Sequence, residues 1–387
     1  MTCTHIRVSL RWPSAAALVL VFLTFILPVR AQDSTIGTLT LARITFTAEQ
    51  TPNPDLNNIL SGMSADSEND IWAVGTAAPG AIGLRFDGST WISVPMELPN
   101  TASMSGVSVR APNDVWAVGD VFDPEQQHFT SVIQHFDGTK WSLVPSPHFK
   151  GGDQLFGVKA IASNDVFAVG GSRSDNQKPL PLIEHFDGSK WTVIPAPALP
   201  KGQSLALRNI AATSHSDVWV TGIGPTGQPP AIMHFDGQQF SNVPFPSAPE
   251  AFLSGLTTIA ANDAWVVGGQ VSGTLTAHWN GTVWTIVPSP NVPNIGSLLG
   301  AVSASSSSDA WAVGCAPCGA DAGIGQTILV EHWNGKRWTI HQTPLIGQGD
   351  ASASVVAFPS GSVFVAGTSF GPIHPLQTLV LHATEGQ

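Results

Sequence analysis

The chain has 387 residues, and only 11% of them are charged, against a usual share of roughly 25%. It contains 13 Trp and 18 Phe but no Tyr, which excludes any mechanism with a tyrosyl nucleophile or radical. The formal net charge of −11 argues against a nucleic-acid partner or an anionic membrane surface, since both attract basic patches.

The first 31 residues predict a secretory signal peptide. Arg7 and Arg11 precede an apolar run over residues 15–29, and residues 29–31 offer a small-residue cleavage site. The run is shorter than the roughly 20 residues of a membrane span. Cleavage removes three arginines and changes the net charge from −11 to −14. We therefore expect a secreted or extracytoplasmic protein of the cell envelope, not inserted in a membrane, with one domain over residues 32–387.

Two short motifs recur along the rest of the chain. The first reads Asn-Asp-Val-Trp-Ala-Val-Gly at residues 113–119, and the second reads His-Phe-Asp-Gly-Thr-Lys-Trp at residues 135–141. The Asp of the first motif recurs in steps of 44, 51, 52, 46 and 46 residues. A period near 50 residues with strand-like content is typical of propeller blades. The first motif has seven copies, which lie at 69–75, 113–119, 164–170, 216–222, 262–268, 308–314 and, in a weaker form, 361–367.

Each unit predicts four strands, which we call a to d. In the third unit, strand a is the small and apolar segment 156–162, and strand c is residues 182–186. Strand b follows an Asn-Asp turn, as at 115–118, and its two faces are both apolar. Asp-Gly or Asn-Gly then makes a hairpin turn, because these residues tolerate positive φ. Strand d alternates apolar and polar residues, as at 191–195.

The two ends of the chain predict how the units close. The seventh unit stops before a strand d, whereas residues 44–54 form a strand-like segment with no unit of its own. This segment parallels residues 284–290 in pattern and in its Pro-rich exit. We therefore predict an all-β, seven-bladed β-propeller of four-stranded antiparallel blades, in which residues 40–54 close the last blade and hide two sheet edges. An open sandwich is the alternative fold.

The paired motifs resemble the repeats of exported bacterial β-propeller proteins, over essentially all of residues 40–387. The Asp-Gly-x-x-Trp part is also similar to the Asp-box hairpin of sialidase-like propellers and, distantly, to kelch-like blades. These resemblances imply the fold and not an activity, because unrelated propellers share this hairpin geometry. Sialidase and galactose-oxidase chemistry both need Tyr, which the chain lacks.

The recurring histidines and aspartates predict structural roles. Strand c lies about 10 Å farther from the axis than strand a, so its histidines cannot converge on one ion. Asp in a turn accepts hydrogen bonds from its own backbone. We therefore predict no metal site among the histidines 135, 185, 234, 278, 332 and 382, nor among the aspartates 70, 87, 114, 137, 165, 187, 217, 236, 263 and 309.

Cys315 and Cys318 are the only cysteines after the leader. Three interpretations exist: a small disulfide, half of a zinc site or a redox motif. A zinc site needs two more ligands at recognisable spacing, and a redox motif normally opens a helix. In an exported chain the spacing favours a disulfide.

The variable b–c and d–a loops share one face of the predicted ring, and function usually lies on such loops. The loops of the second and third units collect both charge signs and amides, a mixture suited to a sugar or a peptide. No cofactor is required by the sequence, although Asp120, Asp123 and Glu125 offer the oxygen ligands that calcium prefers. The candidate ligand-binding residues are Asp120, Asp123, Glu125, His128, His148, Lys150, Arg173 and Asp175.

The sequence favours a monomeric, non-catalytic binding or scaffold propeller that recognises a glycan, peptide or protein through this loop face. The alternative is a polysaccharide hydrolase or lyase with Asp123 and Glu125 as general acid and base. Glycosidases place two carboxyl groups roughly 5–10 Å apart across the scissile bond. Two acids on one loop could meet that requirement.

Overall fold

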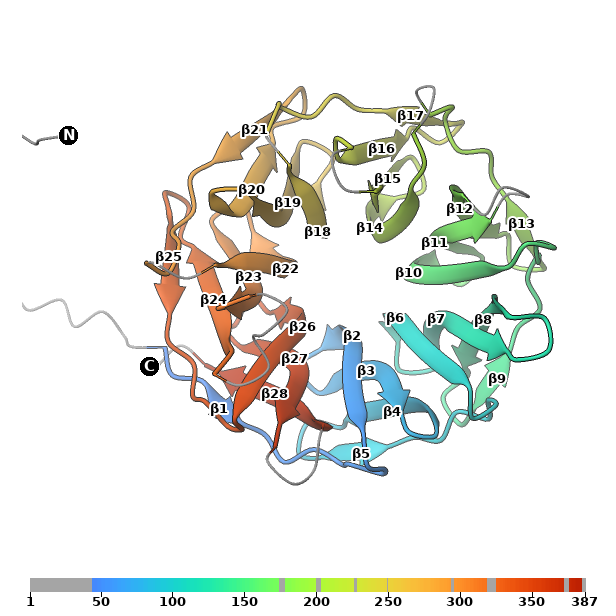
Figure 1. The fold of residues 1–387 in the computed structure, drawn as a ribbon, viewed down its shortest axis with the longest axis horizontal. Coiled ribbons are helices and arrows are strands. Elements are labelled where there is room, and N and C mark those ends of the chain that lie inside the picture. The colour runs from blue at the N-terminus through green and yellow to red at the C-terminus, as the bar shows by residue number, and fades with distance from the viewer. Residues whose placement is uncertain are drawn as a thin grey trace, which may run out of the picture. The chain divides into compact units, whose positions relative to one another are not determined.

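The structure is a computed structural model, and it describes residues 44–173, 178–199, 203–225, 228–248, 250–293, 296–318, 325–371 and 376–384. Within these ranges the regular elements are antiparallel β-strands in seven four-stranded sheets, arranged as the blades of a propeller (Figure 1). No helix in the described ranges is long and apolar enough to span a membrane. The predicted signal peptide lies outside the described residues.

In blades 1 to 6 the strands run outward from the axis in chain order, and blade 7 takes its outermost strand from the start of the chain, as the sequence predicts. The inner strands a are β2 (Asn58–Ser67), β6 (Ala102–Ala111), β10 (Asp153–Ala162), β14 (Ala206–Ser214), β18 (Phe252–Ala260), β22 (Leu298–Ser306) and β26 (Gly349–Ala357). The strands b are β3 (Asp70–Ala77), β7 (Asp114–Asp123), β11 (Asp165–Arg173), β15 (Asp217–Ile223), β19 (Asp263–Gln270), β23 (Asp309–Ala316) and β27 (Val363–Phe370).

The outer half of each blade is made by strands c and d. The strands c are β4 (Gly80–Phe86), β8 (His128–Phe136), β12 (Pro179–Phe186), β16 (Ala231–Phe235), β20 (Gly273–Trp279), β24 (Thr327–Trp333) and β28 (Leu376–Ala383). The strands d are β5 (Trp91–Ser93), β9 (Trp141–Leu143), β13 (Trp191–Val193), β17 (Phe240–Asn242), β21 (Trp284–Val287), β25 (Trp338–His341) and β1 (Thr47–Ala48). We number the blades 1 to 7 from β2 to β26.

Within a blade, the Asp of the first motif joins strand b to strand c. Asp114 Oδ1 accepts hydrogen bonds from His135 Nε2 at 2.9 Å and from Trp116 Nε1 at 2.8 Å. The same Asp–His bond recurs in blades 3, 4, 5 and 6, at 2.7–2.8 Å. These are hydrogen bonds of the kind predicted for the histidines, but the partner of the aspartates differs from the prediction. The carboxylate binds a side chain of strand c rather than capping its own turn.

The second-motif aspartates do cap their own turns, as predicted. Asp137 Oδ1 accepts hydrogen bonds from the backbone N–H groups of Thr139 and Lys140 at 2.8 and 3.0 Å. The Thr139 hydroxyl and these two amides lower the pKa of Asp137 to about 2. Gly138 follows at a φ of 96°, a conformation that favours glycine. The c–d hairpin is therefore set by local chemistry.

Neighbouring blades meet through tryptophan pairs at four joints and through pairs that include phenylalanine at the other three. Trp72 of strand b in blade 1 packs edge-to-face on Trp141 of strand d in blade 2, with ring centroids 5.1 Å apart. Trp219 meets Trp284 in the same way across the joint between blades 4 and 5. Such pairs contribute about 0.5–1.5 kcal/mol beyond the burial of their area. Recurring aromatic residues thus connect each blade to the next.

The N-terminal segment closes the ring as predicted. Thr47 and Ala48 of β1 pair with His382 and Leu381 of β28, so blade 7 takes its outer strand from the start of the chain. Phe46, only 3% exposed, occupies the place of the strand-d tryptophan and packs edge-to-face on Trp311 of blade 6 at 6.1 Å. The segment that follows this outer strand also repeats the pattern of blade 5. The Thr378 hydroxyl donates a hydrogen bond to the side-chain oxygen of Asn53, as the Thr274 hydroxyl does to that of Asn291.

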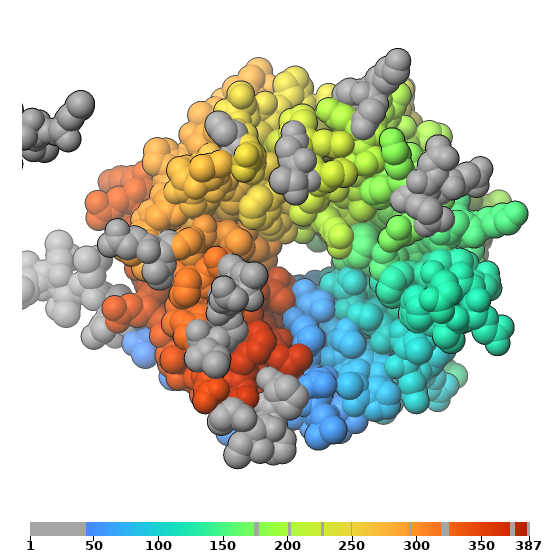
Figure 2. All heavy atoms as spheres, in the orientation of Figure 1, coloured from blue at the N-terminus to red at the C-terminus, as the bar shows by residue number. Residues whose placement is uncertain are grey.

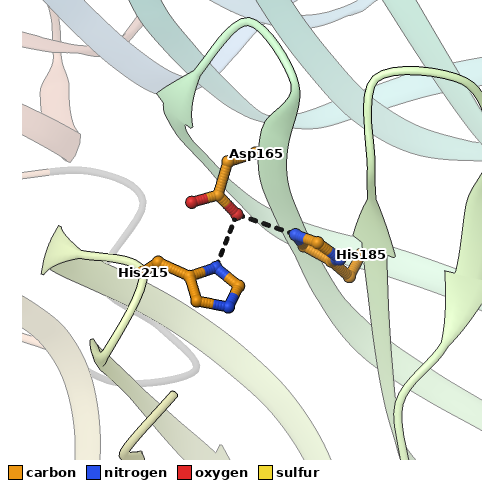
Figure 3. A group of neighbouring side chains, drawn as sticks. All are labelled: Asp165, His185 and His215. Atoms are coloured by element: carbon orange, nitrogen blue, oxygen red, sulfur yellow. Dashed lines mark hydrogen bonds and ion pairs between the residues drawn. The ribbon is translucent and has the colours of Figure 1, made fainter. Parts of the chain in front are cut away.

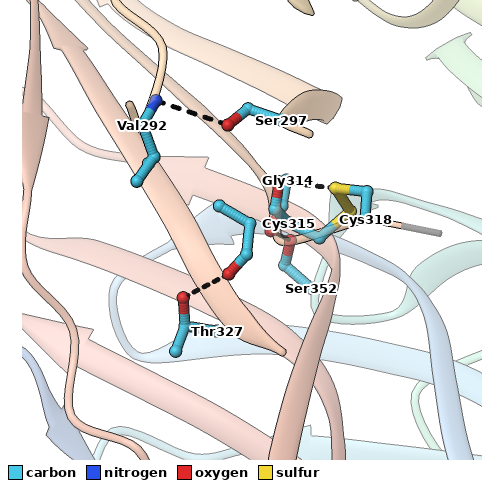
Figure 4. Close-up of a disulfide and its surroundings, with 8 residues drawn as sticks. Val292, Ser297, Gly314, Cys315, Cys318, Thr327 and Ser352 are labelled. Atoms are coloured by element: carbon cyan, nitrogen blue, oxygen red, sulfur yellow. Dashed lines mark hydrogen bonds between the residues drawn. A yellow bond between two sulfur atoms is a disulfide. The ribbon is translucent and has the colours of Figure 1, made fainter. Parts of the chain in front are cut away.

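The predicted disulfide is present in blade 6 (Figure 4). Cys315 lies near the end of β23, and Cys318 follows in the b–c loop, with their Cα atoms 5.5 Å apart. The backbone N–H of Cys318 donates to the carbonyl of Gly296, at the start of blade 6, with a 3.0 Å bond. This hydrogen bond, next to the disulfide, joins the b–c loop to the d–a loop.

We predict that Phe46→Ala lowers the free energy of unfolding by about 3 kcal/mol, because it leaves a cavity in the joint that closes the ring. Urea denaturation followed by tryptophan fluorescence measures the change. Thr47→Ala is the matched control, since that side chain is exposed on the same short strand. Equal stability of the two variants would contradict the role of Phe46.

Candidate ligand-binding site

Each inner strand carries a β-bulge at the same position, near its first end. In blade 2 the bulge is Ser105, between the paired residues Met104 and Gly106. Gly119, the last residue of the first motif, lies opposite Met104, and a Cβ there would come within 1.9 Å of the Ser103 carbonyl oxygen. The glycine is therefore required by the close approach of the two backbones.

The bulged residues line an axial channel of about 520 Å³. One residue of this kind comes from every blade, so the seven positions form a ring around the axis. Figure 2 shows the opening on the axis of the molecule. The seven residues, in blade order, are Ser61, Ser105, Phe156, Arg208, Ser254, Gly300 and Ala353.

Two of the seven are large, and they contact each other. The guanidinium carbon of Arg208 in blade 4 lies 3.8 Å from the ring centroid of Phe156 in blade 3. The other five positions hold only Ser, Gly or Ala. Arg208 is the one charged side chain among the described residues that line the channel, and it makes no ion pair or hydrogen bond with them. Its donors are available to a ligand, and Phe156 holds the plane of the guanidinium.

An acid lies behind this pair. Asp120 of β7 is buried, and its Oδ2 accepts a hydrogen bond from Gln154 Nε2 of blade 3 at 3.0 Å. Burial raises the pKa of Asp120, while the bond from Gln154 and the positive charge of Arg208 act in the opposite direction. Asp120 thus fixes Gln154 and balances part of the Arg208 charge.

A second cavity of about 300 Å³ opens beside the channel, between blades 3 and 4. It shares Phe156, Arg208 and Ile223 with the channel, so the two spaces meet at the stacked pair. Gln154 and the exposed Arg173 also line it. We call the two cavities together, where they meet at Phe156 and Arg208, the channel mouth.

The structure divides the predicted ligand-binding residues into separate places. Asp120 and Arg173 flank the channel mouth, as described above. Asp123, Glu125 and His128 lie on the hairpin between β7 and β8, where His128 Nε2 is 3.0 Å from Gln126 Oε1 and Glu125 is exposed. None of these three lines the channel or the cavity beside it.

The remaining predicted residues belong to the loops around blade 3. His148 is exposed, with Nδ1 3.5 Å from Asp153 Oδ1, and Lys150 is also exposed. His148 and Asp123 line a separate pocket of about 410 Å³ on the outer strands of blade 2. Asp175 lies outside the described residues.

The acids suggested for calcium do not form one group of ligands in the described part of the chain. Asp120 bonds to Gln154, whereas Asp123 Oδ1 accepts the backbone N–H groups of Glu125 and Gln126 at 2.8 and 3.0 Å. The three side chains therefore do not fit a shared calcium ion as they stand.

Phe156 and Arg208 were not among the residues that the sequence indicated. The available signal was a column in the repeats. In blades 1 to 6 a large apolar residue precedes the bulge, and in every blade a small or polar residue follows it. Three of the seven copies have Ser at the bulge and two have Gly or Ala, so the large Phe and Arg side chains are the exceptions. Without the bulge, however, alternation along a strand does not show which residues face the axis.

Comparisons with known proteins show the fold. No protein-family model and no curated protein sequence matches the chain. Among solved structures, YCF48 bound to D1 peptide is 15% identical with a TM-score of 0.57, and the match covers 88% of this chain and 97% of that one. Streptogramin B lyase is 13% identical with a TM-score of 0.61, covering 89% and 99%. A GH74 xyloglucanase from Xanthomonas campestris is 11% identical with a TM-score of 0.51, covering 82% and 53%.

Two glutamates are buried between blades without a hydrogen bond to their carboxyl oxygens in the described structure. Glu184 of β12 and Glu331 of β24 each precede the histidine of strand c. Burial raises the pKa of both to about 8. The charge of Asp153 adds to the effect at Glu184, whereas the side chain of Ser289 lowers the pKa of Glu331. The raised pKa favours the neutral form of both side chains in the folded protein at pH 7.

These glutamates predict that the protein loses stability as the pH rises. A raised folded-state pKa means that the folded protein holds protons that the unfolded chain releases above about pH 4.5. Their contribution is complete below that pH and is lost as the pH rises to about 8. We expect Glu184→Gln to flatten the decline in unfolding free energy between pH 5 and 8, by on the order of 2 kcal/mol. Urea denaturation at several pH values measures it.

Glu125→Gln is the matched control, because Glu125 is exposed. It should leave the pH dependence as in the unmodified protein. An unchanged slope in Glu184→Gln would show that Glu184 is ionised in the folded protein.

Proposed function

We propose that this chain is an extracytoplasmic binding propeller that holds a carboxylate-bearing peptide or protein segment at the channel mouth. The observation that carries the proposal is the Arg208 guanidinium, stacked on Phe156 and without a hydrogen-bond acceptor in the described structure. A preoriented guanidinium is suited to a carboxylate, which it binds with two parallel hydrogen bonds.

The shape of the site favours a chain-like ligand. The channel and the cavity beside it meet at Arg208, so a peptide placed in the cavity can direct a carboxylate toward the axis. Gln154 lines the same path and offers an amide, while Ile223 and Phe156 offer apolar contact. A mixture of a few polar groups with apolar walls is typical of binding pockets.

The fold comparison supports the same class of ligand. YCF48, which shares the propeller architecture, was solved with the D1 peptide bound. The likeness is one of fold, so the choice of a peptide here rests on the geometry of the channel mouth.

An extracytoplasmic location agrees with two features of the chain. Residues 1–31 have the pattern of a signal peptide, and Cys315 and Cys318 form a disulfide, which persists mainly in oxidising compartments. We propose that the mature protein begins after residue 31 and acts outside the cytoplasm.

Binding is favoured over polysaccharide hydrolysis by the state of Asp123. Hydrogen bonds from Gln126 and Glu125 lower its pKa, so the carboxylate stays ionised. A general acid for glycoside cleavage needs a raised pKa. The hydrogen bonds that Asp123 accepts from backbone N–H groups also fix the carboxylate in its own turn.

The test is a peptide array in which every sequence is printed once with a free C-terminal carboxylate and once as the amide. We expect the unmodified protein to bind a subset that depends on carboxylates. Arg208→Gln should weaken that binding roughly 10–100-fold, because a charge-assisted hydrogen-bond pair is lost. Fluorescence anisotropy with the selected peptides measures the affinities.

Phe156→Ser, which introduces the residue of blades 1, 2 and 5, should weaken the same peptides, since it removes the platform under Arg208. Arg337→Gln is the control, an exposed arginine on the opposite face of blade 6. Unchanged affinity in Arg208→Gln, or no peptide bound at all, rejects the proposal. Release of sugar from a polysaccharide that is lost in Glu125→Gln would establish the hydrolase instead.

A further inference from the structure

One blade joint differs from the others in its polar side chains. At the a–b turn face between blades 3 and 4, Asp165 Oδ1 lies 2.7 Å from His185 Nε2 and 3.0 Å from His215 Nδ1. The three ligand atoms lie within 4.8 Å of one another. Figure 3 shows the carboxylate between the two imidazoles. No other group of three such side chains occurs among the residues that the structure describes.

Two changes in the repeat produce this cluster. In blades 2, 4 and 6 the turn Asp accepts a hydrogen bond from a strand-b Trp, but blade 3 has Phe167 at that position. Asp165 therefore has no indole donor. The a–b turn of blade 4 contributes His215 instead, where the corresponding turn residues of blades 1, 2, 3, 5 and 6 are Glu68, Pro112, Ser163, Ala261 and Ser307.

We propose that Asp165, His185 and His215 bind a divalent transition-metal ion, with Zn²⁺ as the ion best suited to the set. Two imidazole nitrogens and one carboxylate are a ligand set that zinc uses when it keeps an open position for water. His215 is half exposed, so an ion can reach the cluster from solvent and retain a water ligand on that side. The partners come from two blades, so the ion links blades 3 and 4.

The two separations from the Asp165 oxygen are close to those of a zinc site. Tetrahedral zinc with bonds of about 2.0–2.1 Å places its ligand atoms roughly 3.3–3.5 Å apart. The present separations from Asp165 are 2.7 and 3.0 Å, so the imidazoles must move outward by several tenths of an ångström. His215 lies on a turn and is exposed enough to move, whereas His185 is held against Phe167, with ring centroids 4.5 Å apart.

A purely structural role for His215 makes different predictions. As a substitute for the missing indole, it would donate one hydrogen bond to Asp165 and pack on Phe167, at 5.8 Å between centroids. That role needs no metal and gives the same stability with or without zinc. The metal site, by contrast, raises the stability of the folded protein with zinc concentration, because the ion binds the folded state.

The test uses the full mature chain with Co²⁺ as a spectroscopic probe and Zn²⁺ for affinity. We expect bound Co²⁺ to give a visible absorption band that disappears when Zn²⁺ displaces it. We also expect Zn²⁺ to raise the melting temperature of the protein. His215→Ser introduces the residue of the blade 3 and blade 6 turns, so the fold should tolerate it. It should lower the zinc affinity, measured by calorimetry, at least about 100-fold.

Asp165→Asn should lower the affinity in the same way, since it removes the charged ligand but keeps a hydrogen-bonding side chain. His278→Gln is the matched control, because His278 pairs with Asp263 in blade 5 without a second imidazole. It should leave zinc binding unchanged. No Co²⁺ absorption, or equal zinc affinity in His215→Ser and the unmodified chain, overturns the proposal. Neither result depends on the peptide site, which lies at the opposite face.

Discussion

The hydrogen bond between a turn aspartate and a histidine of strand c is the interaction on which blades 2 to 6 depend. Asp114 and His135 show it in its full form, with the Trp116 indole as a second donor to the same oxygen. This bond fixes the position of the strand-b indole, and the indole in turn receives the strand-d aromatic ring of the next blade. A local polar contact is thus coupled to the apolar joint between blades, and the coupling repeats around the ring. In blade 1, Arg85 stands at the position of the histidine and forms an ion pair with the turn aspartate, Asp70.

Because the blades repeat the same contacts, residues that depart from the repeat indicate candidate functional sites. The other five blades have small residues at the bulge, so the large side chains of Phe156 and Arg208 are not needed to close the ring of blades. Similarly, Ser or Ala suffices in the a–b turn where His215 stands. Both exceptions involve blades 3 and 4, but they lie at opposite faces: one at the channel mouth and one at the a–b turns. A repeat fold can therefore gain a binding site by changing one or two side chains while its joints remain intact.

Two of the blades bury a glutamate at a repeated position of strand c. Glu184 and Glu331 occupy a strand-c position that is Leu84 in blade 1 and Met233 in blade 4, where an apolar side chain fits the joint. Burial keeps both carboxyl groups protonated near neutral pH, because an ionised carboxylate without a partner is far more costly to bury. The contribution of these two residues to stability is consequently lost as the pH rises to about 8.

The sequence by itself determined the number of blades, the order of their strands, the hairpin turns, the disulfide and the closing segment. These features are local or periodic: Asp-Gly sets a turn through its own backbone, and Phe46 continues a strand-d pattern that recurs in every unit. Only the tertiary structure decided which residues face the axis. A bulge shifts strand alternation by one residue, and its place depends on the backbone of the neighbouring strand. The contact of Arg208 with Phe156, and of His215 with Asp165, joins residues about 50 positions apart in different blades. No local pattern encodes such a contact, because it arises only when two blades pack side by side.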